Sequence, residues 1–360
     1  MIQINWNTMP NLSELALVVP TYNRQMYALR QSHFWSGSPV TLYVLDGTST
    51  PINVKYLKNL GENIHYYHFP YSIEERYGKA VELIDTPYVS LLCDDEFFIP
   101  SALNHCIEEL KAHKDFVAYA GCCLGFHSSK KGIAGVQFQT GWRNITIDGA
   151  TATERIIAHM NPYKVTTTYA VQTADTWKKT MKIITKHRFS SPYIPEFQFE
   201  FATSYQGKSK VIEELMCLRN LENDAIDFHK WNRNMPLGKW INNPLNEEEV
   251  KIFYKDTASE LAKIDGADKE KVLADLKLAV KSHWLQWAVN SPKELLRNRL
   301  LGLIPKKSKR ALEQINVNFR WRQIIEEAEK MQKDGVTVDI KQLQEIVDFI
   351  ERFQEFEKSI

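Results

Sequence analysis

Short apolar runs alternate with segments of helical periodicity along roughly the first third of the chain. Continuous apolar runs bounded by turn residues indicate buried strands, and apolar residues three or four apart indicate helices. Strands that alternate with helices favour an α/β fold with a mainly parallel sheet and flanking helices. The predicted strands are 14–19, 40–45, 63–69, 88–93 and 117–126, and the predicted helices are 23–35, 73–85 and 101–112.

The pattern changes after residue 225. The stretch 230–249 is rich in Asn, Pro and Trp and is loop-like, and the rest has helical periodicity almost throughout. We therefore predict an α/β domain over 1–225 and an α-helical C-terminal domain over 226–360. The predicted helices of the second domain are 246–264, 267–289, 291–302, 307–333 and 339–358.

Three predicted strands end in polar residues. The first ends in TYNR at 21–24, the second at Asp46, and the fourth in the acidic triplet DDE at 94–96. Because ligands of parallel α/β sheets bind beyond the carboxyl ends of the strands, we expect these residues to converge at one edge of the sheet.

The acidic triplet has two interpretations. Its carboxylates could lie in a surface turn or supply negative charge to the N-terminus of the helix that starts near Ser101. Alternatively, adjacent carboxylates repel one another unless a cation lies between them, and hard oxygen ligands suit Mg²⁺ or Mn²⁺.

The composition narrows the class of protein. The formal net charge is +1, so no global field attracts nucleic acid, and the hydrophobic fraction of 44% is ordinary for a globular protein. The five cysteines show no zinc spacing and suit a reducing compartment. No apolar run approaches the ~18 residues of a membrane span. We expect a cytoplasmic protein, with attachment to the inner face of a membrane as the alternative.

Three segments together resemble a known family. LVVPTYNR at 17–24, VLDGTS at 44–49 and AVELIDTPYVSLLCDDEFF at 80–98 are similar, in order and spacing, to motifs of the GT-A glycosyltransferases, especially the family-2 inverting group. The resemblance implies a GT-A, Rossmann-like fold for 1–225, which would bind a nucleotide sugar and carry out catalysis.

The resemblance also implies roles for the strand ends. Tyr22 would lie against the nucleotide base, and Asp46 would accept hydrogen bonds from the base or ribose; the alternative for Asp46 is a turn-forming role. On the helix before the acidic triplet, Arg76 and Lys79 would face the pyrophosphate, or would lie on a solvated helix face. The donor-binding residues implied in this way are Pro20, Thr21, Tyr22, Arg24, Asp46, Arg76, Lys79 and Asp94.

The metal motif departs from the usual form of the family. Cys93 stands where the first Asp is common, and Asp94 and Asp95 follow it. By position, Asp95 resembles the principal ligand of a divalent cation (Mn²⁺ or Mg²⁺), and Asp94 resembles the residue that contacts the ribose and shares the metal.

An inverting transfer also needs a general base for the acceptor hydroxyl. The family places an Asp or Glu about 100 residues after its metal motif, where this chain has Glu196 and Glu200. Glu196 follows Pro195 among aromatic residues, and an apolar setting raises a carboxyl pKa. We favour Glu196 and keep Glu200 as the alternative base; each could instead be an ordinary carboxylate in the first turn of a helix.

The resemblance predicts an inverting glycosyltransferase. It would transfer a sugar from a nucleotide-diphosphate sugar, a UDP-sugar by default, to a hydroxyl of a glycan or lipid-linked glycan in bacterial surface polysaccharide synthesis. One alternative is a degenerate GT-A scaffold or binding protein. Another is a sugar nucleotidyltransferase, although PTYNRQ at 20–25 lacks the glycine-rich phosphate loop of that class.

The C-terminal helices suggest two kinds of partner. Residues 291–310 interleave basic residues with leucines, as in an amphipathic helix on a membrane surface; the alternative is a helix packed on its own domain. The apolar stripe Ile340, Leu343, Ile346, Val347, Ile350 and Phe353 suits packing within the domain or the seam of a homodimer, and we favour the first.

Overall fold

The computed structural model describes residues 4–129, 132–137, 143–191, 193–222, 237–288 and 322–358. Its centre is a ten-stranded sheet in the order β3-β2-β1-β4-β9-β6-β10-β5, with β7 beside β6 and β8 beside β10. The strands are β1 (Leu15–Thr21), β2 (Thr41–Asp46), β3 (Ile64–His68), β4 (Tyr88–Leu91), β5 (Phe97–Phe98), β6 (Phe116–Ser129), β7 (Gly132–Gln137), β8 (Thr146–Ile147), β9 (Val171–Thr173) and β10 (Lys208–Asn220).

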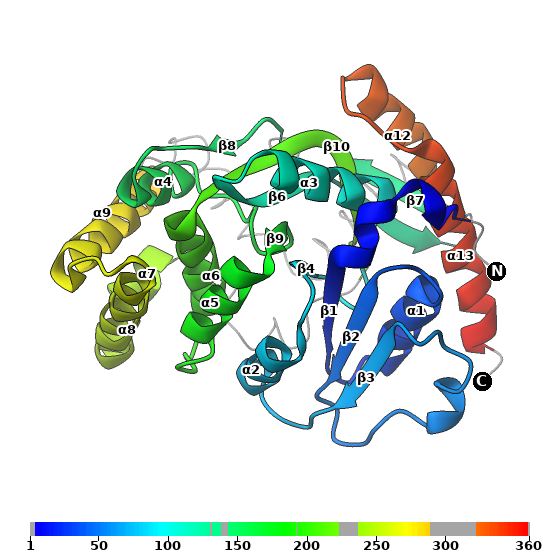
Figure 1. The fold of residues 1–360 in the computed structure, drawn as a ribbon, viewed down its shortest axis with the longest axis horizontal. Coiled ribbons are helices and arrows are strands. Elements are labelled where there is room, and N and C mark those ends of the chain that lie inside the picture. Colours follow the sequence, from blue (N-terminus) through cyan, green and yellow to red (C-terminus); the bar gives the residue numbers. More distant parts are fainter. Residues whose placement is uncertain are drawn as a thin grey trace, which may run out of the picture.

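β1, β2, β3, β4, β6 and β10 run in one direction, whereas β7 is antiparallel to β6. β1 pairs in parallel with β2 and β4, β2 with β3, and β6 with β10. The short β9 lies antiparallel between β4 and β6, so it joins the two parallel groups into one sheet. The predicted α/β fold with a mainly parallel sheet is confirmed (Figure 1).

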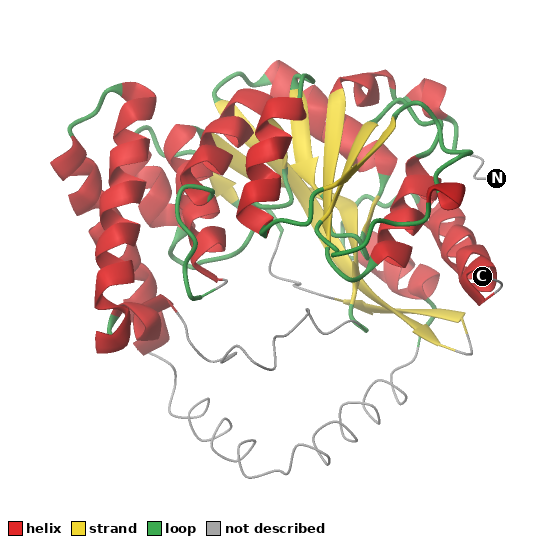
Figure 2. Ribbon diagram, turned by 90° about the horizontal axis from the view of Figure 1, so that it is seen from below, coloured by secondary structure: helices red, strands yellow, loops and turns green. Residues whose placement is uncertain are grey.

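Helices cover both faces of the sheet (Figure 2). One face packs on α1 and α3, and the other packs on α2, α5 and part of α6. The helices are α1 (Gln25–Trp35), α2 (Ile73–Leu83), α3 (Pro100–Ala112), α4 (Ala152–His159), α5 (Ala174–Ile184), α6 (Tyr193–Gln206), α7 (Leu237–Ile241), α8 (Glu247–Asp265), α9 (Lys269–Ala288), α12 (Ile324–Lys333) and α13 (Ile340–Lys358).

Local sequence explains where α2 begins. The Ser72 hydroxyl accepts a hydrogen bond from the Glu75 backbone N–H at 3.2 Å, and the Glu75 carboxylate accepts one from the Ser72 N–H at 3.0 Å. This capping box satisfies two of the N–H groups that a helix start leaves without partners. It fixes the first turn of α2, and Arg76 follows in that turn.

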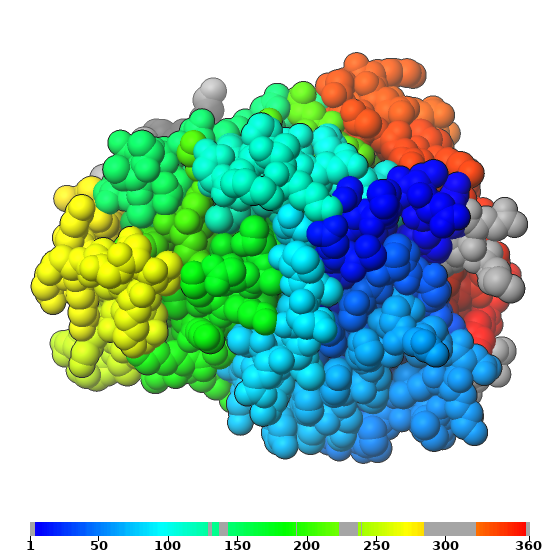
Figure 3. Space-filling view, viewed as in Figure 1, coloured from blue at the N-terminus to red at the C-terminus, as the bar shows by residue number. Residues whose placement is uncertain are grey.

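The helices after residue 225 do not form one unit. Helices α7 to α9 pack with α4 and α6 in one hydrophobic cluster, whereas α12 and α13 belong to the core of the sheet. The C-terminal segment also adjoins the N-terminal segment on the molecular surface (Figure 3). The predicted division between 1–225 and 226–360 falls within 223–236, which lies outside the described residues.

The apolar stripe of α13 is buried inside the protein. Leu343 and Ile346 are fully buried, and the Phe349 ring meets Phe34 of α1 edge-on at 5.3 Å between ring centroids. The stripe therefore packs within the chain, but onto the α/β core and not within a separate C-terminal helical domain. A dimer seam built on this stripe is not available, because its side chains already contact α1 and the sheet.

Two expectations about membranes have different outcomes. The basic segment 291–310 lies outside the described residues, so its contact with a membrane surface stays a prediction. In the part of the chain that is described, no helix combines the length and the apolar character that crossing a bilayer requires.

Replacing Leu343 with Ala should lower the free energy of unfolding by roughly 2–5 kcal/mol, because the change leaves a cavity in the core. Urea denaturation followed by circular dichroism would measure it. The exposed Lys341→Ala should stay within about 0.5 kcal/mol of the wild type. If Leu343→Ala altered only the oligomeric state and left the unfolding midpoint unchanged, α13 would not be part of the core.

Candidate functional site

The carboxyl ends of β1, β2 and β4 meet at one edge of the sheet. Thr21 and Asp46 are paired in the register of β1 and β2, and the Thr21 hydroxyl donates to Asp94 Oδ2 at 2.8 Å. All three side chains are buried. The convergence predicted from the strand ends is therefore confirmed.

Arg24 joins two carboxylates of the acidic triplet. Its Nη2 atom lies 3.1 Å from Asp94 Oδ1 and also forms an ion pair with Asp95 Oδ2. The family resemblance implies that Arg24 binds the donor. In the structure its guanidinium instead forms ion pairs with Asp94 and Asp95. The three side chains are 18%, 7% and 10% exposed, so this charge pairing is only weakly screened by water.

Helix α1 also holds the backbone of the triplet. Arg30 Nη2 donates to the Asp95 carbonyl at 3.0 Å, and Gln31 Nε2 donates to the carbonyls of Asp94 and Glu96. Both side chains are buried. The sequence alone does not reveal these contacts, because no pattern in a single sequence shows that a polar residue on the inner face of a helix will contact a distant loop.

Burial raises the pKa of Asp94 and of Glu96. It raises the pKa of Asp94 to about 6, against the opposing effect of Arg24. It raises the pKa of Glu96 to about 7, although Arg219 of β10 lies 3.4 Å away and opposes the shift. Arg219 was also missed, because it lies on a strand more than 100 residues after the motif.

Asp46 is fully buried and its carboxylate is already occupied. Oδ2 accepts from Gln25 Nε2 at 2.6 Å and from the Tyr66 hydroxyl at 2.5 Å, and Oδ1 accepts from the Thr48 N–H at 2.8 Å. The last contact is the geometry of the turn-forming alternative. Contact of Asp46 with a base or ribose stays a prediction, and it would require exchange of one of these donors.

Arg76 is buried under the same edge. Its Nη1 donates to the backbone carbonyls of Thr21 at 2.7 Å and Leu45 at 2.8 Å. A Cβ on Gly47 would lie 2.7 Å from the guanidinium, so the turn after β2 needs glycine to pass over it. Arg76 thus ties β1 to β2. Its contact with a pyrophosphate stays a prediction.

Lys79 lies on the outer side of α2. Its side chain is 47% exposed and pairs with Glu82 at 3.1 Å. Within the described residues it makes no contact with the acidic triplet, which agrees with the alternative of a solvated helix face.

The loop between β1 and α1 is open to solvent. Tyr22 is 47% exposed, and Pro20 is partly buried at the end of the strand. Asn23 adopts a left-handed conformation with φ of 56°, and its N–H donates to the Thr48 hydroxyl at 2.9 Å. The stacking role of Tyr22 stays a prediction.

Glu196 has the environment expected of a general base. It lies in the first turn of α6, is partly buried, and accepts a hydrogen bond from the Tyr163 hydroxyl at 2.9 Å. Burial and the charge of Glu200 raise its pKa to about 7. A carboxylate with this pKa exchanges a proton readily near neutral pH.

Glu200 has a different environment from Glu196. It is fully buried, lies 2.7 Å from His159 Nε2, and accepts hydrogen bonds from the N–H and hydroxyl groups of Thr167 and Thr168 at 2.7–3.2 Å. Burial opposes its ionisation, but His159 and the threonines outweigh that effect and lower its pKa. A saturated, buried carboxylate is suited to hold the 166–170 segment on α6 and not to accept a substrate proton.

The donor atoms of the acidic pair suit a divalent cation chemically. Mg²⁺ and Mn²⁺ bind through one or two carboxylates together with substrate phosphates, and Asp94 and Asp95 supply such oxygens. Within the described residues, however, no three or more His, Cys, Asp or Glu side chains are grouped so as to hold a metal ion. Cys93 does not add an oxygen ligand, and its thiol donates to the Tyr169 hydroxyl at 3.4 Å.

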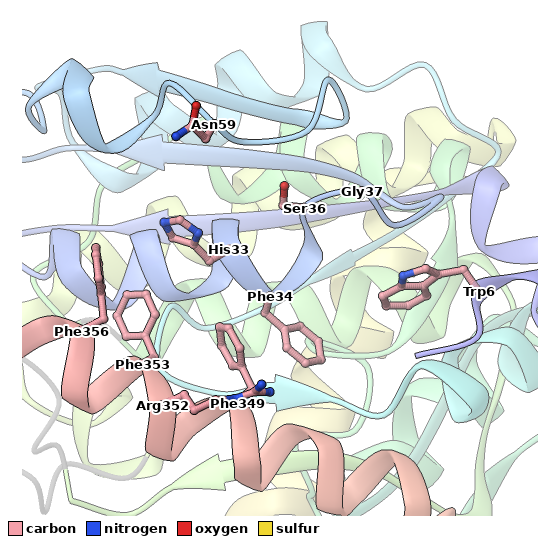
Figure 4. A pocket seen from close by; sticks show the side chains of 10 residues that line it. All are labelled: Trp6, His33, Phe34, Ser36, Gly37, Asn59, Phe349, Arg352, Phe353 and Phe356. Atoms are coloured by element: carbon pink, nitrogen blue, oxygen red, sulfur yellow. The ribbon is translucent and has the colours of Figure 1, made fainter. Parts of the chain in front are cut away.

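A cavity of ≈ 590 Å³ lies away from this edge, between α1 and α13. Phe349, Phe353 and Phe356 of α13 project toward His33 and Phe34 of α1 (Figure 4). The cavity shares no lining residue with the acidic triplet or Glu196. Its aromatic wall is a consequence of how α13 packs onto α1.

Comparison with known proteins finds similar solved structures only. S. aureus TarS 1–349 in complex with UDP-GlcNAc is 16% identical, with 72% of this chain and 70% of that chain covered and a TM-score of 0.46. TarS 1–349 alone is 14% identical, with 75% and 88% covered and a TM-score of 0.43. No protein-family model and no curated protein matches the chain. These scores describe a general likeness, so function has to be inferred from the site's own residues.

Replacing Glu200 with Gln should lower the free energy of unfolding by roughly 3 kcal/mol or more, because His159 and the backbone donors lose a buried charge. Since the pKa of Glu200 is lowered on folding, its stabilisation is present above its ordinary pKa of 4.5 and disappears as the pH falls through the folded value.

Urea denaturation at pH 7 and at acid pH would measure both effects. The exposed Glu270→Gln on α9 is the matched control and should unfold like the wild type. An unchanged midpoint for Glu200→Gln would contradict the structural role.

Proposed function

We propose that this chain is a glycosyltransferase that moves a sugar from a nucleotide-diphosphate sugar to a hydroxyl of a glycan or lipid-linked glycan, with inversion at the anomeric carbon. The default donor is a UDP-sugar, and the setting is bacterial surface polysaccharide synthesis. Both follow from the resemblance of 17–24, 44–49 and 80–98 to the GT-A family-2 motifs.

One observation carries the proposal. The three motif segments come from separate parts of the sequence, and the hydrogen bond from Thr21 to Asp94 and the register pair of Thr21 and Asp46 bring their ends together. A parallel α/β sheet binds its ligands at this edge. A donor would lie along these strand ends, with Tyr22 against the base and Asp94 near the ribose.

Glu196 would act as the general base. Its raised pKa of about 7 suits removal of a proton from an acceptor hydroxyl as that oxygen attacks the anomeric carbon. Tyr163 orients the carboxylate through its hydrogen bond. The positive charge of Arg219 opposes the raised pKa of Glu96 and, more weakly, that of Glu196.

A divalent cation, Mn²⁺ or Mg²⁺, would bind at this site with Asp95 and Asp94 as its protein ligands. When bound, such an ion neutralises the negative charge of the leaving diphosphate. Arg24 supplies a positive charge close to the same carboxylates, and a guanidinium can donate two parallel hydrogen bonds to a phosphate.

The degenerate scaffold is the second candidate, and it is favoured by the occupied carboxylate of Asp46 and by Cys93 in the motif. Product analysis separates the candidates. A glycosyltransferase releases free nucleoside diphosphate, a nucleotidyltransferase releases pyrophosphate, and a scaffold releases neither.

Replacing Glu196 with Gln should lower the rate of nucleoside diphosphate release by about 10²–10⁴-fold, because the base is lost while the side-chain shape is kept. A coupled assay with a panel of nucleotide sugars and glycan acceptors would measure it. Glu270→Gln is again the surface control. Full activity of Glu196→Gln would exclude Glu196 as the base.

The rate of transfer should rise with pH through about 7, where Glu196 loses its proton, and should be about tenfold lower at pH 6 than at its maximum.

The contribution of Glu196 to the free energy of unfolding should change with pH in the opposite direction. Because the folded state raises the pKa of Glu196, its contribution to the free energy of unfolding falls as the pH rises from 4.5 to about 7.

A pH–rate profile and denaturation at matched pH values would test the pair of effects. The Glu196→Gln variant should lose both dependences. A rate that is flat between pH 6 and pH 8 would contradict the assignment.

A further inference from the structure

Arg24 and a divalent cation would use the same oxygens. The guanidinium contacts Asp94 Oδ1 and Asp95 Oδ2, and the other oxygen of Asp94 accepts from the Thr21 hydroxyl. Glu96 turns the other way, toward Arg219 and the Cys217 thiol. A divalent ion that binds through Asp94 Oδ1 and Asp95 Oδ2 therefore competes with Arg24, since two cations in contact with the same oxygens repel each other.

Arg24 is placed where such a displacement is feasible. It is the residue at the start of α1, directly after the loop that contains the exposed Tyr22, and its side chain is 18% exposed. Its Nε atom is buried and has no hydrogen-bond partner within the described residues. Arg30 provides the contrast, because it is 5% exposed and hydrogen-bonded to the Asp95 carbonyl. The backbone of the acidic pair can thus stay in place while Arg24 moves.

A nucleoside diphosphate is the anion that would draw Arg24 away. The guanidinium matches phosphate geometry and can donate two hydrogen bonds to it, so exchanging the carboxylates for a phosphate preserves its charge pairing. The carboxylates are then left without a counter-ion, which favours a divalent cation in its place.

The geometry points to Arg24 as an internal counter-ion that excludes a divalent cation from Asp94 and Asp95 until a nucleoside diphosphate takes its guanidinium. The displacement of Arg24 by a nucleoside diphosphate rests on the proposed function. Metal and nucleotide binding are then coupled through one side chain, and each increases the affinity for the other.

Two titrations of the full chain test the proposal. The first follows Mn²⁺ binding without nucleotide, by the paramagnetic resonance signal of free Mn²⁺. The second follows UDP binding in EDTA by calorimetry. Arg24→Gln should bind Mn²⁺ at least about tenfold more tightly than the wild type, and should bind UDP in EDTA more weakly.

The control variants separate this role from general damage. The double variant Arg24→Gln with Asp95→Asn should return Mn²⁺ binding to the weak value of the wild type, because a ligand is lost. Arg188→Gln removes an exposed positive charge elsewhere and should change neither titration. The opposite directions of the two effects are the signature, since a purely structural role of Arg24 would weaken both.

Mn²⁺ binding by the wild type that equals or exceeds that of Arg24→Gln would overturn the proposal. If the wild type binds Mn²⁺ weakly and Arg24→Gln binds it tightly, but the wild type binds no UDP, the proposed function fails while the exclusion of metal by Arg24 stands. Circular dichroism of each variant would confirm that the proteins compared are folded.

Discussion

The site depends on the burial of carboxylates at the end of β4. A buried carboxylate is costly unless it is paired and hydrogen-bonded, so Asp94 and Asp95 require positive charge and donors within the fold. Helix α1 supplies these through Arg24, Arg30 and Gln31. The acidic pair and α1 therefore act as one unit, and the position of α1 on the sheet determines where the carboxylates lie.

The same requirement explains the contrast between Glu196 and Glu200. They lie one turn apart on α6, yet one carboxylate accepts a tyrosine hydroxyl and has a raised pKa, and the other is saturated by threonines and His159 and has a lowered pKa. The two pKa values shift in opposite directions because burial and the charge of Glu200 dominate at Glu196, whereas His159 and the threonines outweigh burial at Glu200. Such separation of pKa values is typical of sites that assign different roles to neighbouring carboxylates.

The order of the main elements up to residue 126 could be predicted because hydrophobic patterning sets strands and helices locally. The convergence of Thr21, Asp46 and Asp94 also followed from the sequence, since the ends of parallel strands share one edge. The partners of those residues could not be predicted. Gln31, Tyr66 and Arg219 are ordinary polar residues of a helix or strand, and only the packing of distant segments brings them to the carboxylates. The saturation of Glu200 likewise depends on a segment more than 30 residues away.

The close approach of Gly47 to Arg76 has a consequence for the evolution of this fold. The guanidinium occupies the space that a side chain at position 47 would need, and it also joins the carbonyls that end β1 and β2. Positions 47 and 76 are therefore not free to vary independently. A larger residue at 47 would have to displace the Arg76 guanidinium, and that displacement would leave two strand-end carbonyls to find new donors.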